Sequence, residues 1–187
     1  MSSNSREAIL AAAKRTAQAR GYNGLNFRDL ADEVGIRAAS IHYHFATKAD
    51  LGAAVARRYW EDTAAQLEAM LADAPDPAAC LKQYPGMFRK ALGNGNRMCL
   101  CSVMAAERDD LPPAVLQEVQ AFADVNVAWL RRVLVAAGFA STADSTPRAQ
   151  AIFAAVAGAQ LIARSRSDIT LYDVLIGSYR AAGLLPT

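Results

Sequence analysis

The chain has 187 residues, of which 53% are hydrophobic and only 7% aromatic, because 41 residues are alanine. This length suffices for a substantial core, either in one compact unit or in a small domain fused to a larger one. The net charge of +2 neither requires nor excludes nucleic acid as a partner. The whole excess lies in residues 1–50, which carry seven Lys or Arg against five Asp or Glu.

Alanine is the best helix former, and no stretch shows the alternating pattern of a strand, so we expect an all-α fold. No apolar run approaches the roughly 18–20 residues that span a bilayer. The N-terminus lacks a signal-peptide core, so we expect a cytoplasmic protein with no membrane partner. An odd number of cysteines, three, argues against a disulfide framework.

Two helices are predicted at the start of the chain. The first runs over residues 5–20, with Ser5 as its N-cap and Gly21 as its stop. Asn26 then opens a short helix, "FRDLADEV", in a variant of the capping box, and Gly35 ends it.

A third short helix covers about residues 38–45. Ile41 and Phe45 are four residues apart, so they lie on one face and pack inward with Ile36. Three short helices, the second and third separated by a glycine turn, describe a helix-turn-helix module. In such a module the last helix enters the major groove of DNA.

The other faces of the third helix are small or polar. Hydroxyls and imidazoles donate to phosphates, and the Tyr43 ring also offers an apolar face to a thymine methyl. Lys48, in the first turn of the next helix, combines an ammonium with free backbone N–H groups and is suited to anchor a phosphate.

Residue chemistry alone leaves other interpretations open. His42 and His44 are the only histidines, but two positions apart on a helix they point about 200° from each other and cannot chelate one metal ion. We therefore expect no metal and no cofactor. Helix-turn-helix shapes also occur without DNA binding, and the two histidines could be ordinary surface residues.

Six more helical segments follow. Thr47 is the predicted N-cap of a helix to about residue 71, and Pro113 and Pro147 are placed in the first turns of two later helices. The expected segments are 47–71, 77–92, 97–108, 113–137, 147–164 and 169–182.

The stretch "GYNGLNFRDLADEVGIRAASIHYHFATKADL" resembles the N-terminal domain of the TetR family of bacterial transcriptional regulators, over about residues 6–52. The resemblance implies a DNA-binding domain at 1–50 and a ligand-binding and dimerisation domain at 51–187. It places DNA contacts at Arg28, Arg37, Ala39, Ser40, His42, Tyr43, His44 and Lys48. His42 departs from the family pattern, which usually has Tyr there, and this leaves the operator preference open.

One helix-turn-helix reads too few base pairs for specificity, so we expect a homodimer on two half-sites. The candidate interface residues lie at heptad-like spacing or are small enough for close helix approach. They are Leu116, Val119, Ala123, Val127, Leu130, Leu134, Ala154, Ala155, Gly158 and Ala159. The resemblance implies that the last two long helices form a four-helix bundle with their mates, whereas burial within one chain is the alternative.

Residues 52–112 are expected to line most of a cavity for a small-molecule effector. Methionines and aromatics favour a largely apolar molecule, although for each candidate by itself the pattern favours plain core over ligand contact. The candidates are Trp60, Leu67, Tyr84, Met87, Phe88, Met98, Cys99, Cys101, Met104, Phe122, Val125 and Trp129.

The segment "NRMCLCSVMAAE" contains two of the cysteines. A thiol in a first helical turn near Arg97 would have a lowered pKa and react with electrophiles or oxidants. The segment looks like a stretch in some TetR-type regulators that sense electrophiles through cysteine. The alternative is that Cys99 and Cys101 are small buried hydrophobes; zinc is disfavoured because too few ligands are near.

No G-x-S-x-G, P-loop or complete G-x-G-x-x-G motif is present, so we expect no enzyme. The sequence favours a repressor that binds a palindromic operator in double-stranded DNA and is released by a small molecule. An electrophile sensor using Cys99 or Cys101 is the first alternative. A helical small-molecule carrier or enzyme that retains the module is the second.

Overall fold

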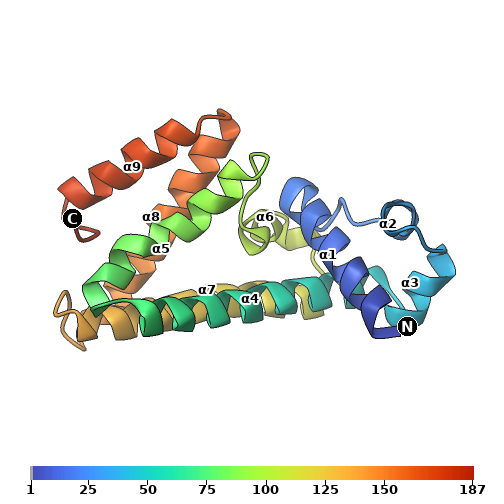
Figure 1. Ribbon diagram of the computed structural model, residues 1–187, viewed down its shortest axis with the longest axis horizontal. Coiled ribbons are helices and arrows are strands. Elements are labelled where there is room, and N and C mark those ends of the chain that lie inside the picture. The colour runs from blue at the N-terminus through green and yellow to red at the C-terminus, as the bar shows by residue number, and fades with distance from the viewer. Residues whose placement is uncertain (1) are drawn as a thin grey trace. The chain divides into compact units, whose positions relative to one another are not determined.

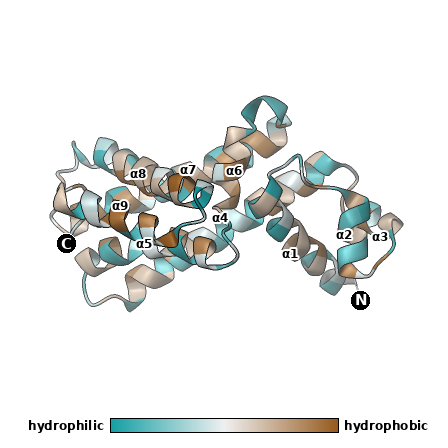
Figure 2. Ribbon diagram, turned by 90° about the horizontal axis from the view of Figure 1, so that it is seen from above, coloured by the Kyte–Doolittle hydropathy of each residue, from teal (hydrophilic) through white to brown (hydrophobic). Residues whose placement is uncertain are grey.

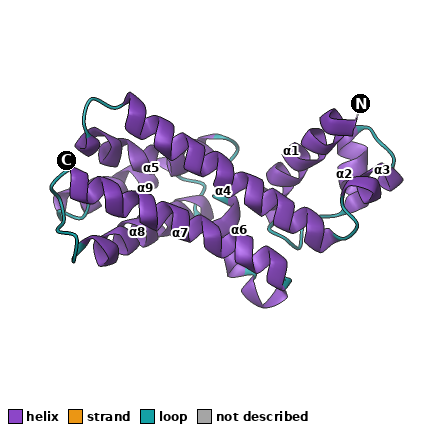
Figure 3. Ribbon diagram, turned by 90° about the horizontal axis from the view of Figure 1, so that it is seen from below, coloured by secondary structure: helices purple, strands orange, loops and turns teal. Residues whose placement is uncertain are grey.

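The computed structural model describes residues 2–187, which form helices and loops but no strand (Figure 3). This confirms the all-α prediction. In chain order (Figure 1) the elements are α1 (Ser2–Arg20), α2 (Phe27–Val34), α3 (Ala38–His44), α4 (Lys48–Asp73), α5 (Pro77–Gly93), α6 (Leu100–Ala106), the 3₁₀ turn η1 (Arg108–Asp110), α7 (Pro113–Ala136), α8 (Ser145–Ser165) and α9 (Ile169–Ala181).

Contacts divide the chain into two compact units. The first contains the residues up to Glu61 together with Leu100–Phe122, and the second contains Asp62–Cys99 and Ala123–Thr187. α6 and the first part of α7 therefore pack with the N-terminal helices, which the expected boundary at residue 50 did not anticipate. The assignment of functions to residues 1–50 and 51–187 stays a prediction.

The first unit is built on a small apolar core. Ile9 of α1, Leu30 of α2, Ile41 of α3 and Leu51 of α4 are each at most 1% exposed. Phe45, directly after α3, is also buried. The inward face predicted from the spacing of Ile41 and Phe45 is therefore confirmed.

Two helix starts differ from the prediction. α1 begins at Ser2, so Ser5 lies inside the helix and is not its N-cap. No proline or glycine precedes Ser5, so nothing in the sequence stops the helix from extending by one turn. α8 begins at Ser145, which leaves Pro147 within the first turn, where a missing N–H costs no intrahelical hydrogen bond.

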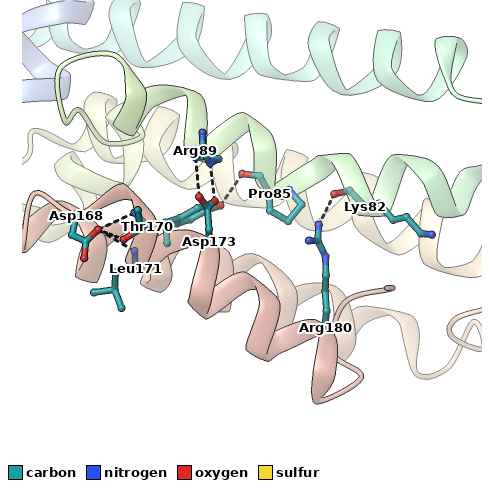
Figure 4. Close-up of polar contacts among 9 residues, drawn as sticks. Lys82, Pro85, Arg89, Asp168, Thr170, Leu171, Asp173 and Arg180 are labelled. Carbon is teal, nitrogen blue, oxygen red and sulfur yellow. Dashed lines mark hydrogen bonds and ion pairs between the residues drawn. The ribbon is translucent and has the colours of Figure 1, made fainter.

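The second unit holds α9 against α5 through polar contacts (Figure 4). The guanidinium of Arg89 donates to both carboxylate oxygens of Asp173, with two N–O distances of 2.7 Å. The hydroxyl of Tyr172 donates to the carbonyl of Pro85 at 2.7 Å. These contacts fix α9 over the middle of α5, at the proline that interrupts the backbone hydrogen bonds of that helix.

Hydrophobic and hydrophilic residues both occur along the helices (Figure 2). Among the described residues, no helix combines the length and the apolar content that a membrane crossing requires.

Candidate nucleic-acid interface

The turn between α2 and α3 has the geometry that a helix-turn-helix needs. Asn26 caps α2 by accepting from the N–H groups of Arg28 (2.8 Å) and Asp29 (3.3 Å). Gly35 ends α2 with φ +75°, a left-handed conformation that favours glycine, and the Ile36 N–H closes the turn onto the Ala31 carbonyl at 3.0 Å. Local sequence signals therefore fix both ends of α2 and lead the chain into α3.

The inner face of α3 holds it against its neighbours. Ile41 is completely buried, and the guanidinium of Arg6 lies 5.4 Å from the centre of the Phe45 ring. The edge of the His42 ring meets the Phe27 ring of α2, with 4.7 Å between the ring centres. α3 is thus fixed relative to α1 and α2, as a helix that reads DNA must be.

The outer face of α3 is open. Tyr43 is 80% exposed, the largest exposure among the large hydrophobic side chains that the structure describes. Of the eight predicted DNA contacts, Arg28, Arg37, Ala39, His42 and Tyr43 are exposed, whereas Ser40, His44 and Lys48 are partly exposed. The exposed phenol, imidazole and guanidinium groups among them can hydrogen-bond to phosphates and base edges.

Lys48 begins α4 directly after α3. Its ammonium donates to the carbonyl of Asn23 at 3.2 Å and lies 4.7 Å from the centre of the Tyr22 ring. Sequence reasoning missed Tyr22 and Asn23 as partners of Lys48, because they lie in the loop between α1 and α2 and carry no periodic signal.

An aromatic cluster lies inside the second unit. The Tyr84 ring stacks on Trp129 with 5.8 Å between ring centres and lies 5.7 Å from Phe88. The Tyr84 hydroxyl donates to the Asn126 side chain at 2.9 Å, and burial raises the pKa of Tyr84 well above its usual value. Three predicted effector residues are therefore together, beside a buried amide that the sequence analysis missed.

A groove of about 240 Å³ lies between α4 and α7 in the same unit. The predicted residues Leu67, Val125 and Trp129 line it together with Ala64, Glu68, Ala128 and Arg132. Met87 is partly exposed and Met98 is buried, both in the second unit.

A second buried amide, Gln160, was also missed. Its side chain donates to the Phe88 carbonyl at 2.7 Å and accepts from the Cys99 N–H at 3.0 Å. Asn126 and Gln160 are polar residues on otherwise apolar helix stripes, and this is the signal that could have identified both.

Four predicted effector residues belong instead to the first unit. They are Trp60, Cys101, Met104 and Phe122. The indole N–H of Trp60 donates to the Glu118 carboxylate at 2.8 Å, and the Arg57 guanidinium donates to the same carboxylate at 3.0 Å through Nε. Trp60 therefore belongs to a partly buried polar cluster between α4 and α7, and its role as an effector contact stays a prediction.

The surroundings of Cys99 and Cys101 bear on the alternative in which one of them is a reactive thiol. α6 begins at Leu100, so Cys99 precedes the helix, and its N–H binds Gln160 in the second unit. Cys99 and Cys101 are each 2% exposed, and neither is joined in a disulfide. Such burial matches the interpretation as small hydrophobes, because a reactive thiol must be reached by its reagent.

The predicted dimer residues divide into two groups. Val119, Leu130 and Leu134 of α7 and Ala159 of α8 are buried within the chain, as the alternative of burial in one chain expects, and the dimer interface stays a prediction. Leu116, Ala123, Val127, Ala155 and Gly158 are partly exposed and Ala154 is exposed. Exposed apolar side chains that the sequence analysis missed lie instead on the last two helices: Leu161 and Ile162 on α8 and Val174 on α9.

An N-terminal helix-turn-helix with an accessible third helix, followed by further helices, defines a class of DNA-binding regulators. The family model for bacterial regulatory proteins of the tetR family matches residues 9–55. None of the curated proteins compared with the chain matches it.

Solved structures extend the similarity over most of the chain. A TetR transcriptional regulator from Legionella pneumophila is 30% identical, with 90% of this chain and 91% of that chain covered and a TM-score of 0.85. A TetR-family regulator from Agrobacterium tumefaciens is 29% identical, with 94% and 95% covered and a TM-score of 0.86. The reduced form of NemR from E. coli, 19% identical with 98% of each chain covered and a TM-score of 0.83, shares the fold. The chain belongs to the TetR family of bacterial transcriptional regulators.

Proposed function

We propose that the protein is a repressor that binds a palindromic operator as a homodimer and is released when a small molecule binds its second unit. The observation that carries the proposal is the outer face of α3. Tyr43 is 80% exposed there, while Ile41 beneath it is completely buried. The exposed phenol, with Arg37 at the start of α3 and His42 on it also exposed, supplies hydrogen-bonding groups that a duplex can use.

The chemistry of the predicted contact residues divides them into base-edge contacts and backbone contacts. Ser40, His42 and Tyr43 are placed to meet base edges and flanking phosphates, and Arg28, Arg37, His44 and Lys48 to meet the backbone of the duplex. Arg28 and Arg37 are exposed and form no ion pair within residues 2–187, so their charge is available to DNA.

We place the dimer interface on α8 and α9. Leu161 is 55% exposed, Ile162 46% and Val174 62%. The small residues Ala154 and Gly158 precede Leu161 by seven and three positions on α8, so they share its side of the helix and permit close approach of another helix. Burial of this apolar surface against a second copy favours association.

The effector is proposed to bind beside the aromatic cluster of the second unit. Tyr84, Phe88 and Trp129 provide flat apolar surfaces, and the groove at Leu67, Val125 and Trp129 provides space that solvent can reach. These features favour a largely apolar molecule with an aromatic or conjugated body. The protein would act in the cytoplasm, where its DNA lies.

The test is selection of duplexes from a random library by the purified chain, followed by competition between the selected duplex and a shuffled one. The expected result is an inverted repeat that resists competition by the shuffled sequence at moderate salt. The Tyr43→Ala variant should lose the preference, whereas Tyr179→Ala, a partly exposed tyrosine on α9, should keep it. Equal binding of both duplexes by the native chain would contradict the proposal.

A further inference from the structure

We propose that Glu107 is a positioning residue for DNA binding: its carboxylate holds the turn between α1 and α2, and this turn holds the ammonium of Lys48. The inference rests on the proposed function, in which Lys48 binds a phosphate. All of the groups involved belong to the first unit.

Glu107 lies at the end of α6 and binds the backbone of the α1–α2 turn. Its carboxylate accepts from the N–H of Tyr22 at 2.5 Å and from the N–H of Asn23 at 3.3 Å. The neighbouring carboxylate of Asp110 accepts from the Asn23 side-chain amide at 2.9 Å. Two acidic residues of the α6–η1 segment therefore fix this turn from outside the helix-turn-helix.

Gly21 makes the close approach of Glu107 possible. It ends α1 with φ +71°, and a Cβ at this position would collide with the Glu107 carboxylate. The left-handed backbone favours glycine here, and the missing Cβ leaves the space that the carboxylate occupies.

The same two turn residues hold Lys48 from the other side. The Asn23 carbonyl accepts from the Lys48 ammonium at 3.2 Å, and the Tyr22 ring lies beneath it, 4.7 Å from ring centre to nitrogen. The Tyr22 ring also packs on Gly52, one helical turn after Lys48, where a Cβ would lie 2.7 Å from Tyr22 Cε2. Tyr22 and Asn23 thus connect the carboxylate of Glu107 to the ammonium of Lys48.

Through these contacts the Lys48 side chain is held in place before a phosphate of DNA binds it. A lysine side chain loses conformational entropy when a phosphate fixes it, and a side chain already held in place loses less. The ammonium has three donor hydrogens, and the Asn23 carbonyl takes one, so others stay available for a phosphate.

We expect Glu107→Gln to change the affinity for DNA in the direction opposite to that expected from its change of charge. Glu107→Gln removes a negative charge from the DNA-binding unit, which by itself strengthens binding to a polyanion. The amide, however, has one acceptor oxygen and places an NH₂ against backbone N–H groups, so the turn is released and binding weakens. Glu33→Gln is the matched control: it makes the same change of charge in the same unit, at an exposed ion pair with Arg15.

The experiment measures affinity for a selected duplex against salt concentration for the native chain, Glu107→Gln, Glu33→Gln, Lys48→Ala and the Glu107→Gln/Lys48→Ala double variant. We expect Glu107→Gln to weaken binding about fivefold, a partial loss of one charge-assisted hydrogen bond. The salt slope is the slope of the logarithm of the binding constant against the logarithm of the salt concentration. Glu107→Gln should make this slope shallower by up to about 0.9 per chain, toward that of Lys48→Ala. In the double variant it should cause no further loss of affinity beyond that of Lys48→Ala. Glu33→Gln should keep the native slope.

Unchanged or tighter DNA binding by Glu107→Gln with the native salt slope would overturn the proposal. So would a loss of affinity from Glu107→Gln that is equally large in the native background and in the Lys48→Ala background. If Lys48→Ala binds like the native chain, Lys48 is no anchor and the inference fails, while duplex discrimination by the native chain still supports the proposed function. If Glu107→Gln fails to fold, the salt dependence of DNA binding is measured for Asp110→Ala, which removes one negative charge and the bond to the Asn23 side chain but keeps the bonds of Glu107, and the same loss is expected.

Discussion

Thr47 and Asp50 exchange hydrogen bonds across the first turn of α4. The Thr47 N–H donates to Asp50 Oδ2 at 2.9 Å, and the Asp50 N–H donates to Thr47 Oγ1 at 3.1 Å. This reciprocal cap ends the segment after α3 and makes Lys48 the first residue of α4. This pair of side chains therefore helps to set the position of the proposed phosphate anchor relative to α3.

The cap predicts a loss of stability in Thr47→Ala. The variant removes the acceptor for the Asp50 N–H, so the free energy of unfolding in urea should fall by about 1 kcal/mol. Thr142→Ala, the same change at an exposed loop residue, should have little effect. Equal unfolding free energies for the native chain and Thr47→Ala would show that the cap does not stabilise the fold.

Gly21→Ala should destabilise the protein more than Gly138→Ala does. Both glycines have φ +71°, so both alanines acquire left-handed backbone strain of about 1 kcal/mol. Only at Gly21 does the new Cβ also displace a carboxylate, because nothing lies within 4 Å of a Cβ at Gly138. Thermal unfolding of the two variants measures the difference, and equal melting temperatures would remove the claimed contact with Glu107.

The lowered pKa of Glu118 leads us to expect that the stability of the fold depends on pH. The hydrogen bonds from Arg57 and then from Trp60 lower the pKa of Glu118 in the folded protein, against the opposing effect of burial. A carboxyl whose pKa is lower in the folded state stabilises the fold above its unfolded pKa of about 4.3, and this contribution is lost as the pH falls through the folded value.

The destabilisation caused by Glu118→Gln should therefore be largest near pH 7 and should shrink as the pH falls below about 4. Urea unfolding at pH 7 and at pH 3 measures it. Glu61→Gln, at an exposed carboxylate of α4, serves as the control and should show a much smaller effect at both values. A constant difference between native chain and Glu118→Gln across this range would contradict the assignment.

The proposed dimer surface predicts that Leu161→Arg yields monomers. A charge placed within the apolar surface of α8 and α9 must be desolvated when two copies associate, which opposes association. Light scattering measures the mass. Val135→Arg, at a 39% exposed apolar residue of α7, should remain dimeric, and monomers in that variant alone would place the interface elsewhere.

Base and phosphate contacts predict different responses to substitution. Lys48→Ala should weaken all duplexes to a similar extent, because phosphates carry no sequence information, whereas Ser40→Ala and Tyr43→Phe should change the ranking of duplexes. Affinities for single-base variants of a selected duplex measure this. A changed ranking in Lys48→Ala together with an unchanged one in Tyr43→Phe would reverse the two roles.

Local signals explain how much of the fold the sequence could predict. Gly21, Asn26, Gly35 and Thr47 each bound a helix through a conformation or hydrogen bond formed within a few residues, and the structure bears out all four. The spacing of Ile41 and Phe45 likewise determined the inner face of α3.

Long-range pairing explains what could not be predicted. Glu107 lies 85 residues from its partner Tyr22, and no periodicity connects the two. An apolar stripe shows that a helix face is buried but not against what, so the stripe on α7 was assigned to a second copy although Leu130 and Leu134 pack within the chain. For the same reason, the location of Trp60 beside Glu118 could not be inferred.

Cross-linking from position 43 tests the central claim most directly. A photoreactive phenylalanine derivative replaces Tyr43, and in a control it replaces Val135 on α7, which lies outside the proposed dimer surface, before irradiation with a selected duplex. We expect cross-links from position 43 to major-groove bases of two half-sites about 10 base pairs apart, and none from position 135. Cross-links from position 135 but not from position 43, or none from either on a duplex that the protein binds, would contradict the central claim.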